Sequence, residues 1–278
     1  MAEREIRKTI RGQHAVDGAG VHMVRVLTPR DVYDFDPFLM LDSFDSTDPA
    51  DYIAGFPTHP HRGIETVTYL IEGQIDHEDS LGNKGSVHGG ESQWMTAGSG
   101  ILHQEMPQPS PRMLGFQLWL NLVRAEKMTA PAYFDITADR MGHAVREGAD
   151  IRILSGSFDG VSGVKAPHVP VELYDITLAP GAVLELPTER DAKVFVFLIV
   201  GAAVIGGKRH AEKTAVLFEE GDSIVIGAPE DAGARVIFFA GKPLGEPIAW
   251  GGPIVMNTDA ELHEAFAELR RGTFIKHR

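Results

Sequence analysis

Two short segments of the sequence each place two potential metal ligands two residues apart. His59 and His61 flank a proline in the first segment, and His103 and Glu105 follow the glycine-rich turn 97–100 in the second. Residues i and i+2 of a β-strand point to the same face, so each pair can present both side chains to one point. Two such pairs on neighbouring strands would surround a single ion.

The donor atoms of these four residues define the chemistry. Three neutral imidazoles and a carboxylate suit a divalent ion such as Fe, Mn, Co, Ni, Cu or Zn. The chain has no cysteine, which excludes thiolate ligands, cysteine nucleophiles and disulfides. Around an octahedral ion, four protein ligands leave two positions open to a chelating substrate or dioxygen, as catalytic sites require. We therefore predict a mononuclear metal site at His59, His61, His103 and Glu105.

Simpler interpretations compete with this one. A His-x-His pair by itself is more often a feature of a surface strand, and it is the combination of two pairs with glycine turns that favours a metal site. The positive charge of Arg62 suits an anionic ligand, but an ion pair with a partner such as Glu65 or Asp79 is the simpler explanation of this residue. The unpaired histidines are interpreted as surface or loop residues: His14, His22, His77 and His88.

Short strands must position these side chains. The 30 glycines and 17 prolines are spread over the whole chain, as is typical of many strands joined by tight turns. Only residues 258–271 have helical periodicity, and the apolar face of that helix should be buried. We therefore predict an all-β fold with one C-terminal helix. Residues 6–27 are predicted to form a hairpin around the turn 17–20. The other strand-like segments are 37–41, 64–71, 92–95, 113–123, 171–178, 194–200, 215–218, 223–226 and 235–240.

The length of 278 residues favours two domains. Alternation is lost around residues 125–131, and we expect domains at 1–135 and 136–278. Residues 69–73 resemble residues 197–201, and residues 90–92 resemble residues 221–223, which indicates an internal repeat of two similar barrels.

Three blocks, residues 56–67, 77–85 and 93–105, resemble the signature blocks of pirins in the cupin superfamily. The stretch 37–42, and 252–257 before the helix, are similar to pirin as well. The resemblance implies two tandem cupin (jelly-roll) β-barrels, with a mononuclear metal, usually iron, in the N-terminal one. Its four ligand positions are filled here by His59, His61, His103 and Glu105.

The resemblance assigns a different character to the second barrel, residues 136–278. In our alignment the positions that match the first ligand pair carry Pro187 and Glu189, and those that match the second fall near Ala234 and Val236. We therefore expect a degenerate, structural barrel without metal, followed by the terminal helix.

Several bacterial pirins are similar to quercetin 2,3-dioxygenases, which open the central ring of a flavonol with dioxygen and release carbon monoxide. This implies a small aromatic, flavonol-like substrate. Glu105 would be both a ligand and the base that accepts the proton of the 3-hydroxyl, which a bound cation acidifies. Strand alternation sends about half of the apolar neighbours of the ligands outward, so we expect no more than two or three of them in the pocket wall. The candidates are Phe56, Ile64, Met95, Ile101, Leu102, Met106 and Phe116.

The competing function is that of a non-enzymatic, redox-responsive iron protein that regulates through protein partners. This alternative follows from the resemblance to eukaryotic pirins, which look like metal-dependent cofactors of transcription regulators. The net charge of −13 argues against direct contact with nucleic acid. The charged N-terminus is unlike a secretory signal, and no apolar run reaches the roughly 18 residues of a membrane span. We expect a cytoplasmic monomer.

Overall fold

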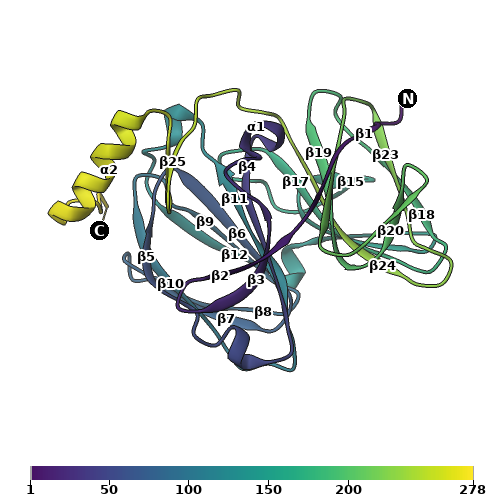
Figure 1. Cartoon of the computed structure of the whole chain (residues 1–278), viewed down its shortest axis with the longest axis horizontal. Helices are drawn as coiled ribbons and strands as arrows, with labels where there is room; N and C mark the ends of the chain where they lie inside the picture. Colours follow the sequence, from purple (N-terminus) through teal and green to yellow (C-terminus); the bar gives the residue numbers. More distant parts are fainter. Residues whose placement is uncertain (1, 278) are drawn as a thin grey trace. The chain divides into compact units, whose positions relative to one another are not determined.

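The computed structural model describes residues 2–277, which fold mainly into antiparallel β-sheets (Figure 1). This confirms the all-β prediction. The chain forms two compact units. The N-terminal unit comprises His14–Val32, Pro37–Thr137 and the chain from Leu244 onward. The C-terminal unit comprises the chain up to Gln13, Tyr33–Asp36 and Ala138–Pro243.

The N-terminal unit combines a seven-stranded sheet, in the order β12-β9-β6-β11-β4-β3-β2, with a four-stranded sheet, in the order β5-β10-β7-β8. A short hairpin, β25-β26, and helix α2 complete it. The bounds are β2 (Gln13–Asp17), β3 (Val21–Leu27), β4 (Phe38–Ser46), β5 (Phe56–His61), β6 (Ile64–Glu72), β7 (Gln74–Asp79), β8 (Lys84–His88), β9 (Ser92–Thr96), β10 (Ile101–Pro107), β11 (Met113–Asn121), β12 (Ala132–Ile136), β25 (Ala249–Gly251), β26 (Ile254–Met256) and α2 (Asp259–Arg271).

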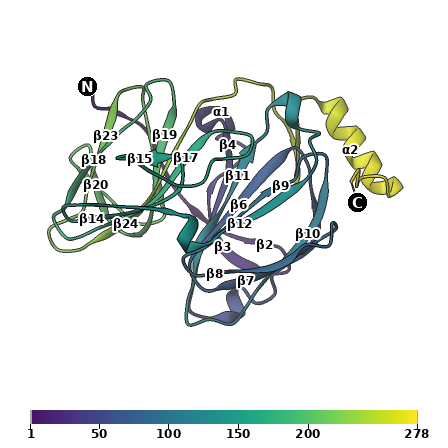
Figure 2. The same cartoon turned by 180° about the vertical axis from the view of Figure 1, so that it is seen from behind.

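The C-terminal unit repeats this plan with sheets β1-β22-β19-β24-β17-β14-β13 and β18-β23-β20-β21, and a small pair β15-β16 (Figure 2). The bounds are β1 (Ile6–Arg11), β13 (Gly142–Arg146), β14 (Ala149–Ser155), β15 (Ser157–Phe158), β16 (Val161–Ser162), β17 (Val171–Leu178), β18 (Val183–Pro187), β19 (Lys193–Gly201), β20 (Ala203–Ile205), β21 (Lys208–His210), β22 (Thr214–Phe218), β23 (Ser223–Gly227) and β24 (Ala234–Gly241). The remaining helices are short: α1 (Val32–Phe35) and the 3-10 turns Pro49–Asp51, Arg124–Glu126 and Ala138–Arg140.

The two units correspond strand for strand, which supports the predicted repeat and the match of residues 69–73 with 197–201. Two parts of our alignment were wrong. Residues 90–92 lead into β9, whose counterpart is β22, whereas residues 221–223 lead into β23. The counterpart of the ligand strand β10 is β23, whereas Ala234 and Val236 lie on β24, the counterpart of β11. In β18 and β23 the inward side chains are apolar and join the core that the two sheets share: Leu184, Leu186, Ile224 and Ile226.

The first segment of the chain belongs to the C-terminal unit, and the last segment belongs to the N-terminal unit. Strand β1 takes the sheet edge in the C-terminal unit that β12 takes in the N-terminal unit. Arg4 fixes this end, because its buried guanidinium donates to the carbonyls of Ala192 and Glu219 and to Thr188 Oγ1. The expected division at residue 135 stays a prediction, since both units are discontinuous in sequence.

Helix α2 begins and ends with strong local signals. Thr258 and Glu261 form a capping box, and Gly272 ends the helix with a left-handed conformation. Ala265 is buried with Ile254 and Phe274, so the apolar face of the predicted helix is covered. Among residues 2–277, no helix has the length and apolar character needed to cross a membrane.

Candidate metal centre

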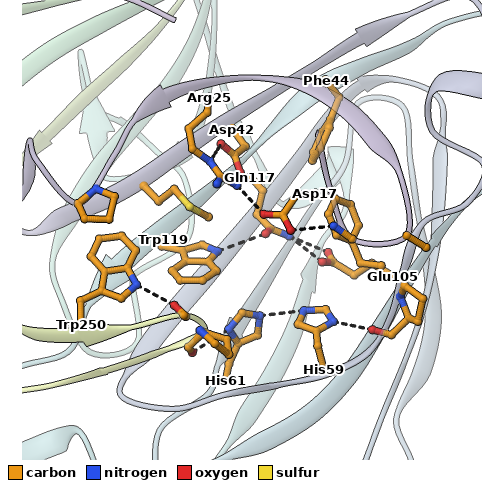
Figure 3. Close-up of a pocket in the computed structure, with 18 residues that line it drawn as sticks. Asp17, Arg25, Asp42, Phe44, His59, His61, Glu105, Gln117, Trp119 and Trp250 are labelled. Atoms are coloured by element: carbon orange, nitrogen blue, oxygen red, sulfur yellow. Dashed lines mark hydrogen bonds and ion pairs between the residues drawn. The ribbon is translucent and has the colours of Figure 1, made fainter. Parts of the chain in front are cut away.

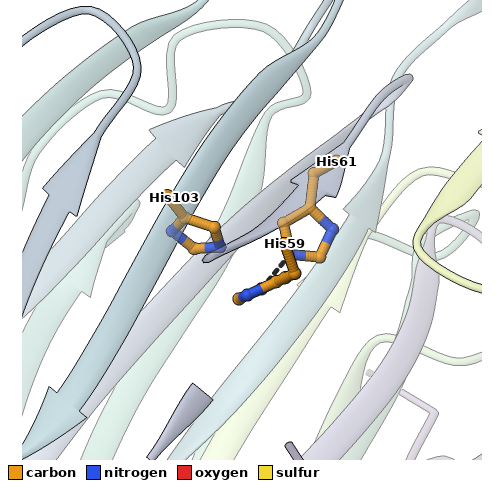
Figure 4. Close-up of side chains that lie close together, drawn as sticks. All are labelled: His59, His61 and His103. Carbon is orange, nitrogen blue, oxygen red and sulfur yellow. Dashed lines mark hydrogen bonds between the residues drawn. The ribbon is translucent and has the colours of Figure 1, made fainter. Parts of the chain in front are cut away.

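Adjacent strands β5 and β10 bring the predicted histidines together. The antiparallel register places His59 opposite His103, and His61 follows two residues later on the same face of β5. One ring nitrogen from each of the three histidines lies within 4.8 Å of the other two (Figure 4). His61 and His103 are almost fully buried. Within the described residues, the three imidazoles thus form a compact group of nitrogen donors.

Hydrogen bonds to backbone carbonyls fix the tautomers of two of these rings. His59 Nδ1 lies 2.9 Å from the Pro57 carbonyl oxygen, and His61 Nδ1 lies 3.2 Å from that of Pro253. A carbonyl oxygen only accepts, so each Nδ1 carries the proton and each Nε2 exposes its lone pair. Metal-binding histidines typically donate their second ring nitrogen in this way.

The two Nε2 lone pairs face each other at 3.0 Å. This contact is not an ordinary hydrogen bond while both Nδ1 atoms keep their protons. Two nitrogens that bind one ion at about 2.1 Å and at a right angle would lie about 3.0 Å apart. The arrangement therefore fits a shared cation, which would replace the repulsion between two lone pairs with two coordinate bonds.

Burial favours the neutral form of His61 and His103. Desolvation, and then the neighbouring imidazoles, hold the pKa of His61 well below its usual value, and the same causes lower the pKa of His103. His103 Nε2 is buried without a hydrogen-bond partner in the described structure. A buried nitrogen without a partner is costly in a folded protein, and a metal ion would satisfy it.

Glu105 lines a cavity together with His59 and His61, but its carboxylate is hydrogen-bonded to Gln117 and Thr68 (Figure 3). Gln117 Nε2 lies 2.9 and 2.8 Å from its two carboxylate oxygens, and Thr68 Oγ1 donates to one of them at 3.2 Å. Trp119 Nε1 donates to Gln117 Oε1 at 3.3 Å, which sets the direction of the amide. The compact donor group contains the three histidines and not Glu105. The roles of Glu105 as fourth ligand and as base therefore stay predictions.

The cavity, of about 680 Å³, is lined by His59 and His61 but not by His103, and all of its lining belongs to the N-terminal unit. Trp119 and Trp250 stack with ring centroids 5.8 Å apart, and the rings of Trp119 and His61 pack edge to face with centroids 4.9 Å apart. Phe44 and Phe56 add further apolar wall. The site therefore combines nitrogen donors with aromatic surfaces that suit a flat, largely apolar molecule.

The side of the cavity away from the histidines is polar (Figure 3). Arg25 pairs with Asp42 at 2.7 Å and with Asp17 at 2.8 Å. Hydrogen bonding to Asp42 raises the pKa of Arg25 further above its already high value, so the guanidinium stays charged. Two carboxylates surround one cation here, which gives no net attraction for an anionic ligand.

Of the seven candidates for the pocket wall, Phe56 lines the cavity, within the limit of two or three that we expected. Ile64, Met95 and Ile101 belong to the core cluster that also contains Trp119. Trp119 and Trp250 were missed. A tryptophan in an apolar strand carries no sequence signal for its direction, and Trp250 reaches the cavity from the distant C-terminal segment.

Two polar residues also differ from their predicted environment. His77 is buried on β7, opposite Glu105 on β10, and its ring contacts Tyr133, so the surface interpretation was wrong. Its inward position follows from strand alternation. His14, His22 and His88 are exposed, as predicted. Arg62 pairs at 2.7 Å with Glu268 of α2, in place of the suggested acidic partners.

Two family models match the chain. Residues 20–120 match Pirin, and residues 173–275 match the Pirin C-terminal cupin domain. A pirin-like protein of Caulobacter vibrioides is 40% identical over 278 residues, covering 99% of this chain and 100% of that protein.

Solved structures agree with this assignment. A quercetin 2,3-dioxygenase from Acinetobacter baumannii superposes with a TM-score of 0.89 at 31% identity, covering 98% of this chain and 99% of that one. The bacterial pirin YhhW of Escherichia coli, solved in complex with nickel(II), has a TM-score of 0.65 at 26% identity, covering 85% of this chain and 99% of that one. These likenesses confirm the predicted pair of cupin barrels, and the chain belongs to the pirin family.

Proposed function

We propose that this pirin is a metal-dependent dioxygenase that opens the central ring of a flavonol such as quercetin. One dioxygen would be consumed and one carbon monoxide released for each flavonol. The observation that carries the proposal is the cluster of three imidazoles, two of which, those of His59 and His61, line an aromatic-walled cavity. The likeness to a quercetin 2,3-dioxygenase of Acinetobacter baumannii over nearly the whole chain supports it.

The donor set supports a divalent ion held by His59, His61 and His103, with Glu105 as the fourth ligand. Iron(II) is our proposed ion, and Mn, Co, Ni, Cu or Zn would accept the same donors. Such a cation would favour the deprotonated form of a flavonol hydroxyl that binds to it.

The residues of the chain supply the rest of the chemistry. We propose that Glu105 accepts the proton of the flavonol 3-hydroxyl, while the Gln117 amide holds its carboxylate in place. Trp119 and Trp250 provide a stacked face against which flat rings can lie. The burial of His61 and His103 would also limit the access of bulk water to the reacting atoms.

The test is anaerobic reconstitution with Fe(II), metal analysis, and then measurement of oxygen uptake with quercetin. The wild type should bind one equivalent of iron and consume oxygen only when quercetin is present. His61→Ala should lose both properties, whereas His88→Ala, a change at an exposed histidine of the same unit, should keep them.

Two results would contradict the proposal in different ways. Bound iron without quercetin-dependent uptake would favour another substrate or a regulatory function through protein partners. Failure of the wild type to bind iron, nickel or zinc would refute the metal centre itself.

A further inference from the structure

The C-terminal segment Ala249–Phe274, which we call the C-terminal clamp, supplies one of the contacts that define the metal centre. The Pro253 carbonyl accepts the hydrogen bond from His61 Nδ1, although 192 residues separate the two. The next contacts continue along the ligand strand, because Val255 N donates to the Arg62 carbonyl at 3.1 Å. The orientation of His61 thus depends on where the clamp lies.

Lys127 ties this clamp to the ligand strand. Its Nζ donates to the Gly63 carbonyl at 2.8 Å, to the Val255 carbonyl at 3.0 Å and to Asn121 Oδ1 at 2.7 Å. One side chain therefore joins the backbone two residues beyond His61 to the backbone two residues beyond Pro253. The lysine is only 1% exposed.

A second tie lies at the far end of the clamp. The Arg62 guanidinium donates to the Phe274 carbonyl at 2.8 Å, lies 4.1 Å from the centre of the Phe274 ring and pairs with Glu268 at 2.7 Å. Its Nε donates to the Ser99 carbonyl at 2.7 Å, so the side chain that follows His61 in sequence is held by the clamp and by the turn before β10, and not by the cavity.

Packing alone does not explain a lysine at position 127. Burying an ammonium group is costly, and an unbranched apolar residue would fill similar space without that cost. All three hydrogen-bond acceptors are neutral, so the group does not complete an ion pair. What the lysine does provide is a fixed distance between the clamp and the strand that carries His61.

We propose that Lys127 is a positioning residue of the metal centre: by holding Val255 against Gly63, it keeps the Pro253 carbonyl on His61 Nδ1. The inference rests on the metal centre of the proposed function, but not on the reaction. Loss of a partner that orients a metal ligand typically weakens metal binding about 10- to 100-fold.

The first test is a competition titration with Ni²⁺ on the wild type, Lys127→Met and Lys213→Met. Lys213 is a matched control, because it also donates to a backbone carbonyl, that of Ile199, but lies in the C-terminal unit. We expect Lys127→Met to bind nickel about 10- to 100-fold more weakly and Lys213→Met to bind it as the wild type does. Equal affinity in all three proteins would overturn the inference. Absence of binding in the wild type would refute the metal centre instead.

The second test needs no metal and separates positioning from general loss of stability. Long-range ¹H–¹⁵N correlation spectra of the imidazoles report which ring nitrogen carries the proton. His61 should be the Nδ1–H tautomer in the wild type and a mixture in Lys127→Met. His59 should stay unchanged, because its acceptor, Pro57, is local. An unchanged His61 in Lys127→Met would overturn the inference, even if nickel affinity fell.

Glu268→Gln provides a second route if Lys127→Met does not accumulate as folded protein. This nearly isosteric change loosens the far tie by removing the charge that faces Arg62. It should weaken nickel binding severalfold and shift His61 in the same direction. Wild-type affinity together with a wild-type His61 spectrum would show that the clamp does not control the metal centre.

Discussion

The charge on Lys127 should make the stability of this protein depend on pH in a defined direction. Burial lowers the pKa of Lys127 to about 7, against the raising influence of Glu246 and Glu261, while the unfolded chain keeps a lysine pKa near 10.5. Between these values the unfolded state binds the extra proton and the folded state does not. The free energy of unfolding contributed by this group therefore rises as pH increases from about 7.

The magnitude follows from linkage. Each pH unit inside this window is worth about 1.4 kcal/mol, so the contribution should increase by about 2 kcal/mol between pH 7.5 and 9.0. Lys127→Met removes the group and leaves the other titrating residues in place. The difference in free energy of unfolding between the wild type and Lys127→Met should therefore change by about 2 kcal/mol over this range, in favour of the wild type at higher pH.

Urea denaturation at several pH values, followed by fluorescence, measures this difference directly. Both proteins should be metal-free, so that proton release from the histidines on metal binding does not contribute. A difference that stays constant from pH 7.5 to 9.0 would refute the reasoning. It would mean that the three neutral acceptors hold the ammonium charged throughout and that burial does not control its titration.

Three further substitutions test the site. Gly63→Ala should destabilise the fold by at least about 2 kcal/mol in urea denaturation, because its φ of +78° disfavours a side chain and the new Cβ would lie 1.9 Å from the Val255 carbonyl oxygen. Gly82→Ala, at a φ of +87° with open space around it, is the control and should cost clearly less. Gln117→Leu removes donors at 2.8 and 2.9 Å from the Glu105 carboxylate, and hydrogen bonds to charged groups are worth about 1.5–3 kcal/mol. Quercetin-dependent oxygen uptake should fall about tenfold or more while metal analysis still finds one equivalent, and wild-type uptake would exclude a role for Gln117. Trp250→Ala removes half of the stacked wall, so the KM for quercetin should rise about three- to tenfold with little change in kcat, and an unchanged KM would place the substrate elsewhere.

Local spacing predicted the parts of the site that lie on one strand. His59 and His61 on β5, and His103 on β10, meet because strand alternation and glycine turns are readable in short segments. His77 has no such paired ligand and was interpreted as a surface or loop residue, but it is buried on β7. Strand alternation predicts which side chains of a strand share a face. Which of the two faces is buried depends on the sheet that packs against the strand.

Contacts between distant segments could not be predicted in this way. Pro253 contributes a backbone carbonyl, which every residue type has, so nothing in its identity indicates that it orients His61. Trp250 reaches the cavity as part of the C-terminal clamp, and Lys127 contacts both that clamp and Gly63. The sequence shows the chemical type of these residues. Their role depends on contacts between segments more than a hundred residues apart, such as Lys127 with Val255 and His61 with Pro253.

The two units show that the barrel itself does not specify a metal. Both have the same order of strands, and β18 and β23 occupy in one unit the places that β5 and β10 occupy in the other. Where the N-terminal unit directs imidazoles inward, the C-terminal unit directs leucine and isoleucine, and these fill its interior. These inward leucine and isoleucine side chains offer no donor atom at the places that correspond to the histidines. We therefore expect metal binding in this fold to follow from a few inward positions on two strands, together with the chain segment that holds one of those strands in register.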